Sequence, residues 1–255
     1  ASNNVSVLLG IGNGAFGTAV NYTTGTGSNP TSVTLGDVNR DGVLDIITAN
    51  RNSDTASVLL GNGMAPGDFG SATNFATGDA PSSVTLGDVN GDGKLDIITA
   101  NEGSDTSSVL LGNGDGTFAS AATISTGDAP KSVTLGDVNG DGRLDIISAN
   151  SGSASASVFL GTGGSAITAT FLTQPSLATG TKPYSVTLGD VNGDGILDMV
   201  TANYVSDNVS VLLGNGDGTF ATAVNYGTGN GPSSVTLGDV NRDGKLDIIT
   251  ANELS

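Results

Sequence analysis

The stretch Ser32–Asn50, SVTLGDVNRDGVLDIITAN, decides how this chain folds, because it returns four more times with few changes. The other copies begin at Ser83, Ser132, Ser185 and Ser234, and the first aspartates of successive copies are 51, 49, 53 and 49 residues apart. A regular period near 50 residues indicates a repeat architecture in which each repeat is one supersecondary unit.

Each repeat reads as four short β-strands. The segments SVTLGDV, LDIITAN and SVLLGN, and the segment after the following Phe, are rich in Val, Ile, Leu and Thr and are separated by clusters of Gly, Asn, Asp and Pro. Glycine interrupts every candidate helical pattern. Four-stranded units of this length predict an all-β fold, a β-propeller of five four-stranded blades.

The two ends of the chain also carry pieces of the repeat. The opening ASNNVSVLLG and the final TANELS, joined head to tail, resemble the internal stretch TANYVSDNVSVLLG at 201–214. We therefore expect the N- and C-terminal strands to complete one blade, so that residues 1–255 form a single β-propeller domain of five repeats without an open sheet edge. The alternative is a fragment of a longer array.

The composition excludes several classes of function. The chain has no His and no Cys, which removes thiol nucleophiles, Ser-His triads and the usual zinc ligands. Its net charge of −17 argues against nucleic acid and anionic lipid as partners. No apolar run approaches the length that spans a bilayer, so we expect no membrane insertion.

The turn in each copy, D-V-N-x-D-G-x-L-D, has the residue types that a hard cation prefers. Side-chain oxygens stand at positions 1, 3, 5 and 9, Gly at position 6 permits a sharp bend, and position 7 offers a backbone carbonyl. An EF-hand would need an acid at position 12 and flanking helices, whereas position 12 is Thr or Ser here. Five such turns in register predict about five bound Ca²⁺ ions; Asx-rich β-turns without metal are the alternative.

These repeats resemble the FG-GAP or VCBS repeats of integrin-α-like calcium-binding β-propellers, most specifically in DVNGDGKLD and its variants. The resemblance implies that the loop joins the first two strands of each blade and binds calcium. It implies side-chain ligands at Asp37, Asn39, Asp41 and Asp45; Asp88, Asn90, Asp92 and Asp96; Asp137, Asn139, Asp141 and Asp145; Asp190, Asn192, Asp194 and Asp198; and Asp239, Asn241, Asp243 and Asp247. Position 7 would give only its carbonyl, from Val43, Lys94, Arg143, Ile196 and Lys245. Integrin-like propellers usually have seven blades, so blade number departs from the family pattern.

The resemblance leads us to expect an extracellular, secreted or cell-surface adhesion or ligand-binding module, with calcium in a structural role. A protein or glycan ligand would bind the face opposite the calcium loops, where the loops between second and third strands differ most and where Tyr184 and Tyr204 are candidate aromatic contacts. The alternative is a structural subunit of a surface layer, sheath or fibre that self-associates. A further alternative function is that of a lectin or of a non-catalytic domain of a larger enzyme. We expect no enzymatic activity, because the repeated acids are already assigned to calcium.

Overall fold

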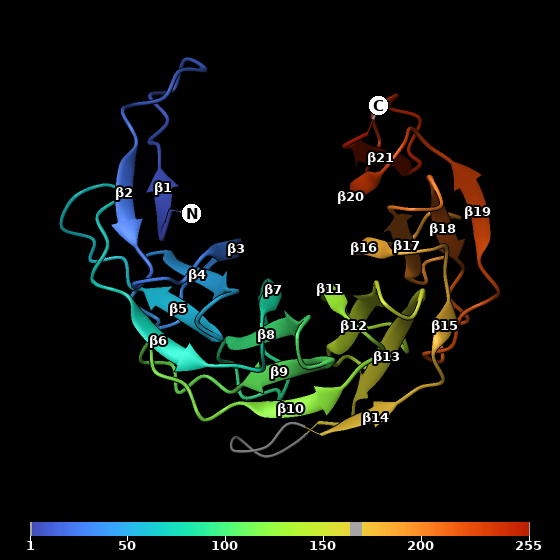
Figure 1. Cartoon of the computed structure of the whole chain (residues 1–255), viewed down its shortest axis with the longest axis horizontal. Helices are drawn as coiled ribbons and strands as arrows, with labels where there is room; N and C mark the ends of the chain where they lie inside the picture. Colours follow the sequence, from blue (N-terminus) through green and yellow to red (C-terminus); the bar gives the residue numbers. More distant parts are fainter. Residues whose placement is uncertain (1, 164–169, 255) are drawn as a thin grey trace.

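The structure, a computed structural model, describes residues 2–163 and 170–254. Within these ranges every regular element is a β-strand, and the strands form six antiparallel sheets that follow one another around an open arc (Figure 1). The predicted all-β, propeller-like arrangement of four-stranded units is confirmed.

Four sheets carry the complete repeat, each built outward from the inner side of the arc. The first sheet contains β3 (Pro30–Gly36), β4 (Asp45–Asn50), β5 (Thr55–Leu59) and β6 (Thr73–Ala76). The second contains β7 (Pro81–Gly87), β8 (Asp96–Asn101), β9 (Thr106–Leu110) and β10 (Ala122–Ser125). The third contains β11 (Pro130–Gly136), β12 (Asp145–Asn150), β13 (Ser155–Gly161), β14 (Phe171–Thr173) and the short β15 (Leu177–Ala178). The fourth contains β16 (Pro183–Gly189), β17 (Asp198–Asn203), β18 (Asn208–Leu212) and β19 (Val224–Gly227).

The terminal strands differ from the expectation that they would complete one blade. They form two separate two-stranded sheets, one of β1 (Asn4–Val7) and β2 (Val20–Thr23), the other of β20 (Pro232–Gly238) and β21 (Asp247–Asn252). Figure 1 shows these two sheets facing each other across the opening of the arc. The angle between neighbouring sheets is set by their side-chain packing, and at that angle the two ends do not meet.

Burial explains the sequence pattern of the second strand. The strands β4, β8, β12 and β17, with sequences such as DIITAN, are buried along their whole length because each has a strand on both edges and a sheet on both faces. Such strands read as continuous rather than alternating apolar runs. Each first strand begins at a proline, where the register with the second strand shifts by one residue.

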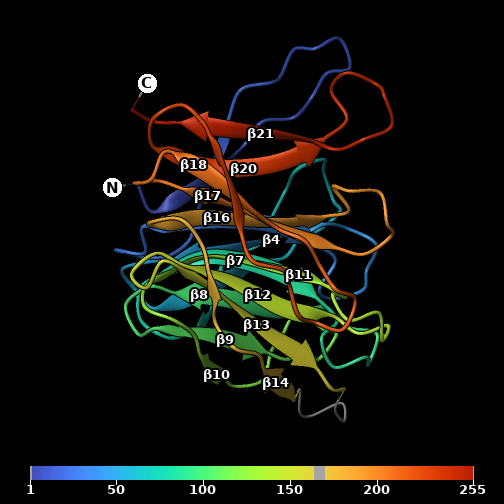
Figure 2. The same ribbon diagram turned by 90° about the vertical axis from the view of Figure 1, so that its right-hand side faces the viewer.

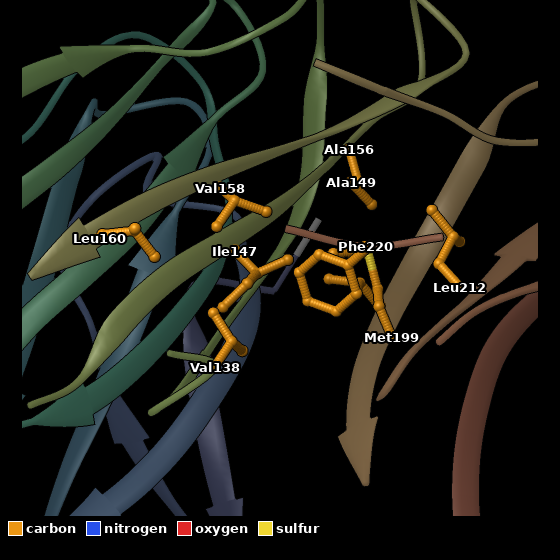
Figure 3. Packing of buried hydrophobic residues seen from close by; sticks show 10 residues of the cluster. Val138, Ile147, Ala149, Ala156, Val158, Leu160, Met199, Leu212 and Phe220 are labelled. Carbon is orange, nitrogen blue, oxygen red and sulfur yellow. The ribbon is translucent and has the colours of Figure 1, made fainter. Parts of the chain in front are cut away.

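The apolar core lies between neighbouring sheets rather than inside one of them. Between the third and fourth sheets, Val138 and Ile147 face Met199, Leu212 and Phe220 (Figure 3). Equivalent clusters fill the spaces between the first and second sheets, between the second and third, and between the fourth sheet and the β20–β21 pair. Each repeat is therefore stabilised mainly by its neighbours, as in other repeat proteins.

Turning the molecule by 90° shows the strands crossing the view, with their connecting loops collected at the two faces of the arc (Figure 2). The loops between first and second strands all lie at one end of the sheets, since equivalent strands run in the same direction in every repeat. The loops between second and third strands lie at the other end. The fold thus separates the acidic turns from the variable loops.

Candidate metal centres

The acidic turns connect the first strand to the second in each complete sheet and in the β20–β21 pair. In the first turn the amide of Asp41 donates to Asp37 Oδ1 at 3.1 Å and to Asn39 Oδ1 at 3.2 Å. The amide of Gly42 donates to Asp37 Oδ2 at 2.9 Å, and that of Val43 to Asp41 Oδ1 at 2.8 Å. The turn therefore brings the oxygens of positions 1 and 3 onto a single amide.

The same arrangement occurs in all five turns. The amide of position 5 donates to both position 1 and position 3 at 2.8 to 3.2 Å in every copy. The predicted ligands at positions 1 and 3 thus meet at one amide in each turn. For position 7, the amide donates to the carboxylate of position 5 in each copy.

The glycine of position 6 has the positive φ that the bend requires, with φ of 83° at Gly42. Sequence reasoning missed that position 4 is left-handed too. It is Gly in three turns, but Arg40 and Arg242 adopt φ of 62° and 64° in the other two. The recurrence of Gly at position 4 was the signal that could have revealed this second bend.

The aspartate of position 9 has a different environment from the other three side chains. Asp96 is fully buried, and its carboxylate accepts from the amide of Val89 at 2.9 Å and from that of Gly112 at 2.8 Å. Asp45, Asp145 and Asp198 make the same pair of bonds in their own sheets. Position 9 therefore ties the acidic turn to the end of the third strand.

Burial makes the carboxyl groups of Asp45, Asp96 and Asp145 harder to ionise. Desolvation raises the pKa of Asp96 to about 6, although the two backbone amides oppose the shift and the charges of Asp92 and Asp88 add to it. The pKa values of Asp45 and Asp145 are raised by desolvation in the same way. A bound cation would relieve this penalty.

The oxygen donors of each turn are of the type that a hard cation prefers, but they are not arranged as a complete coordination shell. In four turns the asparagine Nδ2 donates to the carboxylate of position 5, so a partly positive group lies where a cation would neutralise that carboxylate. Within residues 2–163 and 170–254, no three acidic side chains are grouped closely enough to hold a metal. Ion binding would require Asn to turn its Oδ1 inward and position 9 to share its oxygens.

In the second and third turns the basic side chain of position 7 pairs with the carboxylate of position 5, and the distance in the third, Arg143 Nη1 to Asp141 Oδ2, is 3.5 Å. In the second turn, Lys94 Nζ contacts Asp92 Oδ2 at 3.1 Å, and the buried Asn90 Nδ2 is left without a partner. Burial opposes ionisation of Asp92, but the hydrogen bonds from Lys94 outweigh it and lower the pKa of this carboxyl. Lysine therefore acts as a built-in counter-charge in this turn.

The opposite face carries a row of side chains that differ from repeat to repeat. Arg51 pairs with Glu102, and Glu102 also pairs with Lys131 at 2.7 Å. Lys131 Nζ lies 5.4 Å from the ring centre of Tyr184, which stacks on Tyr204 with ring centres 4.5 Å apart. The two tyrosines predicted as aromatic contacts thus lie together, half-buried, within the fourth repeat, and Lys131 links them to the third.

Among the described residues, no helix is long and apolar enough to cross a membrane. The curated proteins contain no significant relative of this chain.

Several solved structures resemble the chain. A lectin from Agrocybe aegerita, whose structure concerns specific recognition of non-reducing terminal N-acetylglucosamine, is 25% identical with a TM-score of 0.62, over 98% of this chain and 69% of its own. A candidate 6-phosphogluconolactonase from Bacteroides fragilis is 16% identical with a TM-score of 0.69, over 97% and 68%. A functionally unknown protein from Desulfotomaculum acetoxidans is 13% identical with a TM-score of 0.63, over 91% and 66%. The chain thus spans about two thirds of each.

The family comparison covers nearly the whole chain. The FG-GAP-like repeat matches five times, at residues 1–48, 42–99, 88–148, 137–201 and 190–250. Each match ends in the second strand that follows an acidic turn. The chain therefore belongs to the family of FG-GAP-like repeat proteins.

Proposed function

We propose that this protein is a calcium-binding β-propeller of the extracellular space or cell surface, in which Ca²⁺ is structural and the opposite face binds a ligand. The observation that carries the proposal is that the Asp oxygen of position 1 and the Asn oxygen of position 3 meet at one amide in all five turns. Each turn also holds a position 9 carboxylate, and three of these have raised pKa values. A cation at each turn would reduce both the mutual repulsion and the burial penalty.

The expected contribution of calcium to stability is substantial. Extracellular calcium modules have dissociation constants of about 10⁻⁴ to 10⁻³ M, so about 1 mM free Ca²⁺ would stabilise each site by about 0.4 to 1.4 kcal/mol. Five sites would contribute about 2 to 7 kcal/mol, against a usual total of about 5 to 15 kcal/mol. Chelation should therefore lower the melting temperature clearly.

The test is a calorimetric titration of the chelated protein with Ca²⁺, combined with thermal unfolding. We expect about five ions per chain and a rise in Tm. In the variant Asp41→Asn, one ion should be lost; Asp115→Asn, in an exposed turn outside the five loops, serves as the matched control and should keep all of them. A titration without heat, or the same loss in both variants, refutes the calcium role.

The ligand-binding part of the proposal is supported by the non-repeated row from Arg51 to Tyr204 on the other face. Both protein and glycan are candidate ligands; the 25% identical lectin favours testing terminal N-acetylglucosamine first. The probes are an array of glycans ending in N-acetylglucosamine and a panel of extracellular matrix proteins. Binding should fall in Tyr184→Ala and not in Tyr226→Ala, an exposed tyrosine on β19. Equal binding by both variants would exclude this face.

A catalytic role has little support in this chain. Structural neighbours with lactonase names are 16% or less identical and share only the fold. The acids of the repeats serve the turns, and the row on the opposite face is held by pairing and stacking. We therefore propose a binding module rather than an enzyme.

A further inference from the structure

One basic side chain crosses from the first acidic turn to the second. Arg40, at position 4 of the first turn, donates through Nη2 to the carbonyl oxygen of Gly93, at position 6 of the second turn. A Cβ on Gly93 would lie 3.2 Å from Arg40 Nη2, and one on Gly114, in the turn after β9, would lie 3.5 Å from Arg40 Cδ. The side chain of Arg40 therefore fills the space between the first two acidic turns and is bonded to the second.

The equivalent space between the second and third acidic turns is a cavity. It has a volume of about 150 Å³ and is lined by positions 1 to 4 of the second turn, residues 88–91, and by positions 6 to 8 of the third turn, residues 142–144. Position 4 is Gly91 here, and a Cβ on it would meet no atom within 4 Å. Glycine at position 4 therefore leaves open the place that an arginine side chain occupies between the first two turns.

The walls of this cavity carry groups that suit a guanidinium. Gly142 stands where Gly93 stands in the preceding turn, so its carbonyl oxygen is the equivalent acceptor, and the carboxylate of Asp88 on the other wall favours a cation. Asn90, which is 6% exposed, also lines the cavity, and its Nδ2 has no hydrogen-bond partner. Because an unpaired buried donor is costly beside an apolar group, the cavity favours a polar occupant.

The basic side chain of the third turn borders this cavity without filling it. Arg143 pairs with the carboxylate of position 5 in its own turn, and its Nε lies 2.9 Å from the place of a Cβ on Gly163. Lys94 takes the same course in the second turn, since it pairs with position 5 and passes 3.1 Å from the place of a Cβ on Gly114. Lys94 and Arg40 thus occupy neighbouring places, so Arg143 likewise leaves room for a second guanidinium.

We infer that the space between the second and third acidic turns is a binding site for a guanidinium group, supplied by an arginine side chain of a partner protein or peptide. A volume of about 150 Å³ suits this group and its nearest methylenes. Arginine fits better than lysine, because its planar group presents several donors to the acceptors on two walls. The net charge of −17 favours the approach of a basic partner.

This site is separate from the ligand-binding surface proposed above. The acidic turns lie at the end of the sheets opposite the row from Arg51 to Tyr204, so the two sites are on different faces of the arc. The inference also does not depend on whether the turns hold calcium, because its test is made in metal-free buffer.

The test follows binding to the full chain by NMR, through the backbone amides of Gly91 and Gly142. The probe is N-acetyl-argininamide, and the matched neutral compound is its citrulline counterpart, which has a urea in place of the guanidinium. We expect saturable shifts of both amides with the arginine probe and about tenfold weaker binding of the citrulline compound, because hydrogen bonds from a charged group are stronger. Individual amides are followed because Gly140 and Gly193 also stand at position 4 of their turns.

Two reciprocal substitutions at position 4 test the site itself. Gly91→Arg should fill the cavity from within and abolish the shift at Gly142. Gly91 has φ of 76° and Arg40 adopts 62°, so arginine can take this backbone conformation. Arg40→Gly should open the equivalent space between the first two turns and add a probe-dependent shift at Gly93. Asn52→Arg, which adds the same charge at an exposed position on the opposite face, is the matched control and should bind like the parent.

Each of the following results overturns the inference: unchanged binding in Gly91→Arg, no new shift in Arg40→Gly, or equal binding of the citrulline compound. A loss of the same size in Asn52→Arg would show a general effect of charge and overturns it as well. Arg40→Gly gives the first turn the sequence DVNGDG of the next three turns, so it keeps the test decisive even where Gly91→Arg fails to fold.

Discussion

The glycine at the end of the first strand packs against two leucines of the next repeat at four sheet interfaces, and this contact gives the sharpest quantitative prediction. At Gly136, a Cβ would lie 2.6 Å from Leu188 Cδ1 and 3.0 Å from Leu197 Cδ1. Overpacking of this kind costs about 1 to 3 kcal/mol, while replacing Gly by Ala at a permitted backbone conformation stabilises by about 0.4 to 1 kcal/mol through the unfolded chain. Gly136→Ala should therefore lose stability through overpacking and regain part of it through the unfolded chain.

Gly238 provides the internal control, because it has the same sequence context, TLGDV, and no neighbour within 4 Å. Gly238→Ala should gain only the unfolded-state effect and raise stability slightly. The difference between the two variants isolates the steric cost of about 1 to 3 kcal/mol, which corresponds to about 2 to 12 °C in Tm for a chain of this size.

The assay is thermal and urea unfolding of both variants beside the parent, in the same calcium concentration. Gly136→Ala should unfold at a lower temperature than Gly238→Ala. If the two variants have equal Tm values, or if Gly238→Ala is the less stable one, the leucine pairs do not pack on the glycines and the account of the sheet interfaces fails.

Three further outcomes follow from the structure. In chelator, the contribution of Asp96 to stability should be lost as pH rises from about 4 to 6, because the folded pKa of Asp96 lies above its unfolded value and folding therefore favours the protonated form. In urea unfolding across that range, the stability of Asp96→Asn relative to the parent should therefore rise with pH, and Ca²⁺ should reduce this change. Partial burial opposes ionisation of Glu102, but hydrogen bonds from Arg51 and Lys131 lower its pKa, so Glu102→Gln should cost up to about 1 kcal/mol at pH 7 and progressively less as pH falls below the unfolded pKa of 4.5; an equal cost at pH 3 would contradict this. Phe220→Ala should cost about 3 to 5 kcal/mol because Phe220 fills the core between the third and fourth sheets, whereas Phe16→Ala, at a 66% exposed position, should cost little; equal denaturation midpoints would refute the assignment.

The position 9 aspartates show where reasoning from the sequence reached its limit. Spacing alone grouped Asp96 with Asp88, Asn90 and Asp92 as equivalent oxygens. The structure separates it, because Gly112 on a later segment of the repeat donates to its carboxylate. That donor is 16 residues away along the chain, and its direction depends on how the third strand pairs with the second.

The contacts along the row from Arg51 to Tyr204 could not be predicted from the sequence either. They join residues 20 to 53 positions apart, so no local pattern predicts that Glu102 lies between Arg51 and Lys131 or that Tyr184 stacks on Tyr204. These contacts exist because each repeat places the residue after its proline and the residue after its second strand at the same face as those of its neighbour.

The sequence by itself determined the repeat, the four strands of each unit and the five acidic turns, because these depend on residue types a few positions apart. The position of DVNxDG between two β-rich segments predicts a sharp turn with converging oxygens whatever surrounds it. Only the tertiary structure decided the angle between sheets, and with it the separation of β1 from β21. That angle depends on glycines and leucines of different repeats that pack against each other, and the local pattern does not show which repeats meet or at what angle.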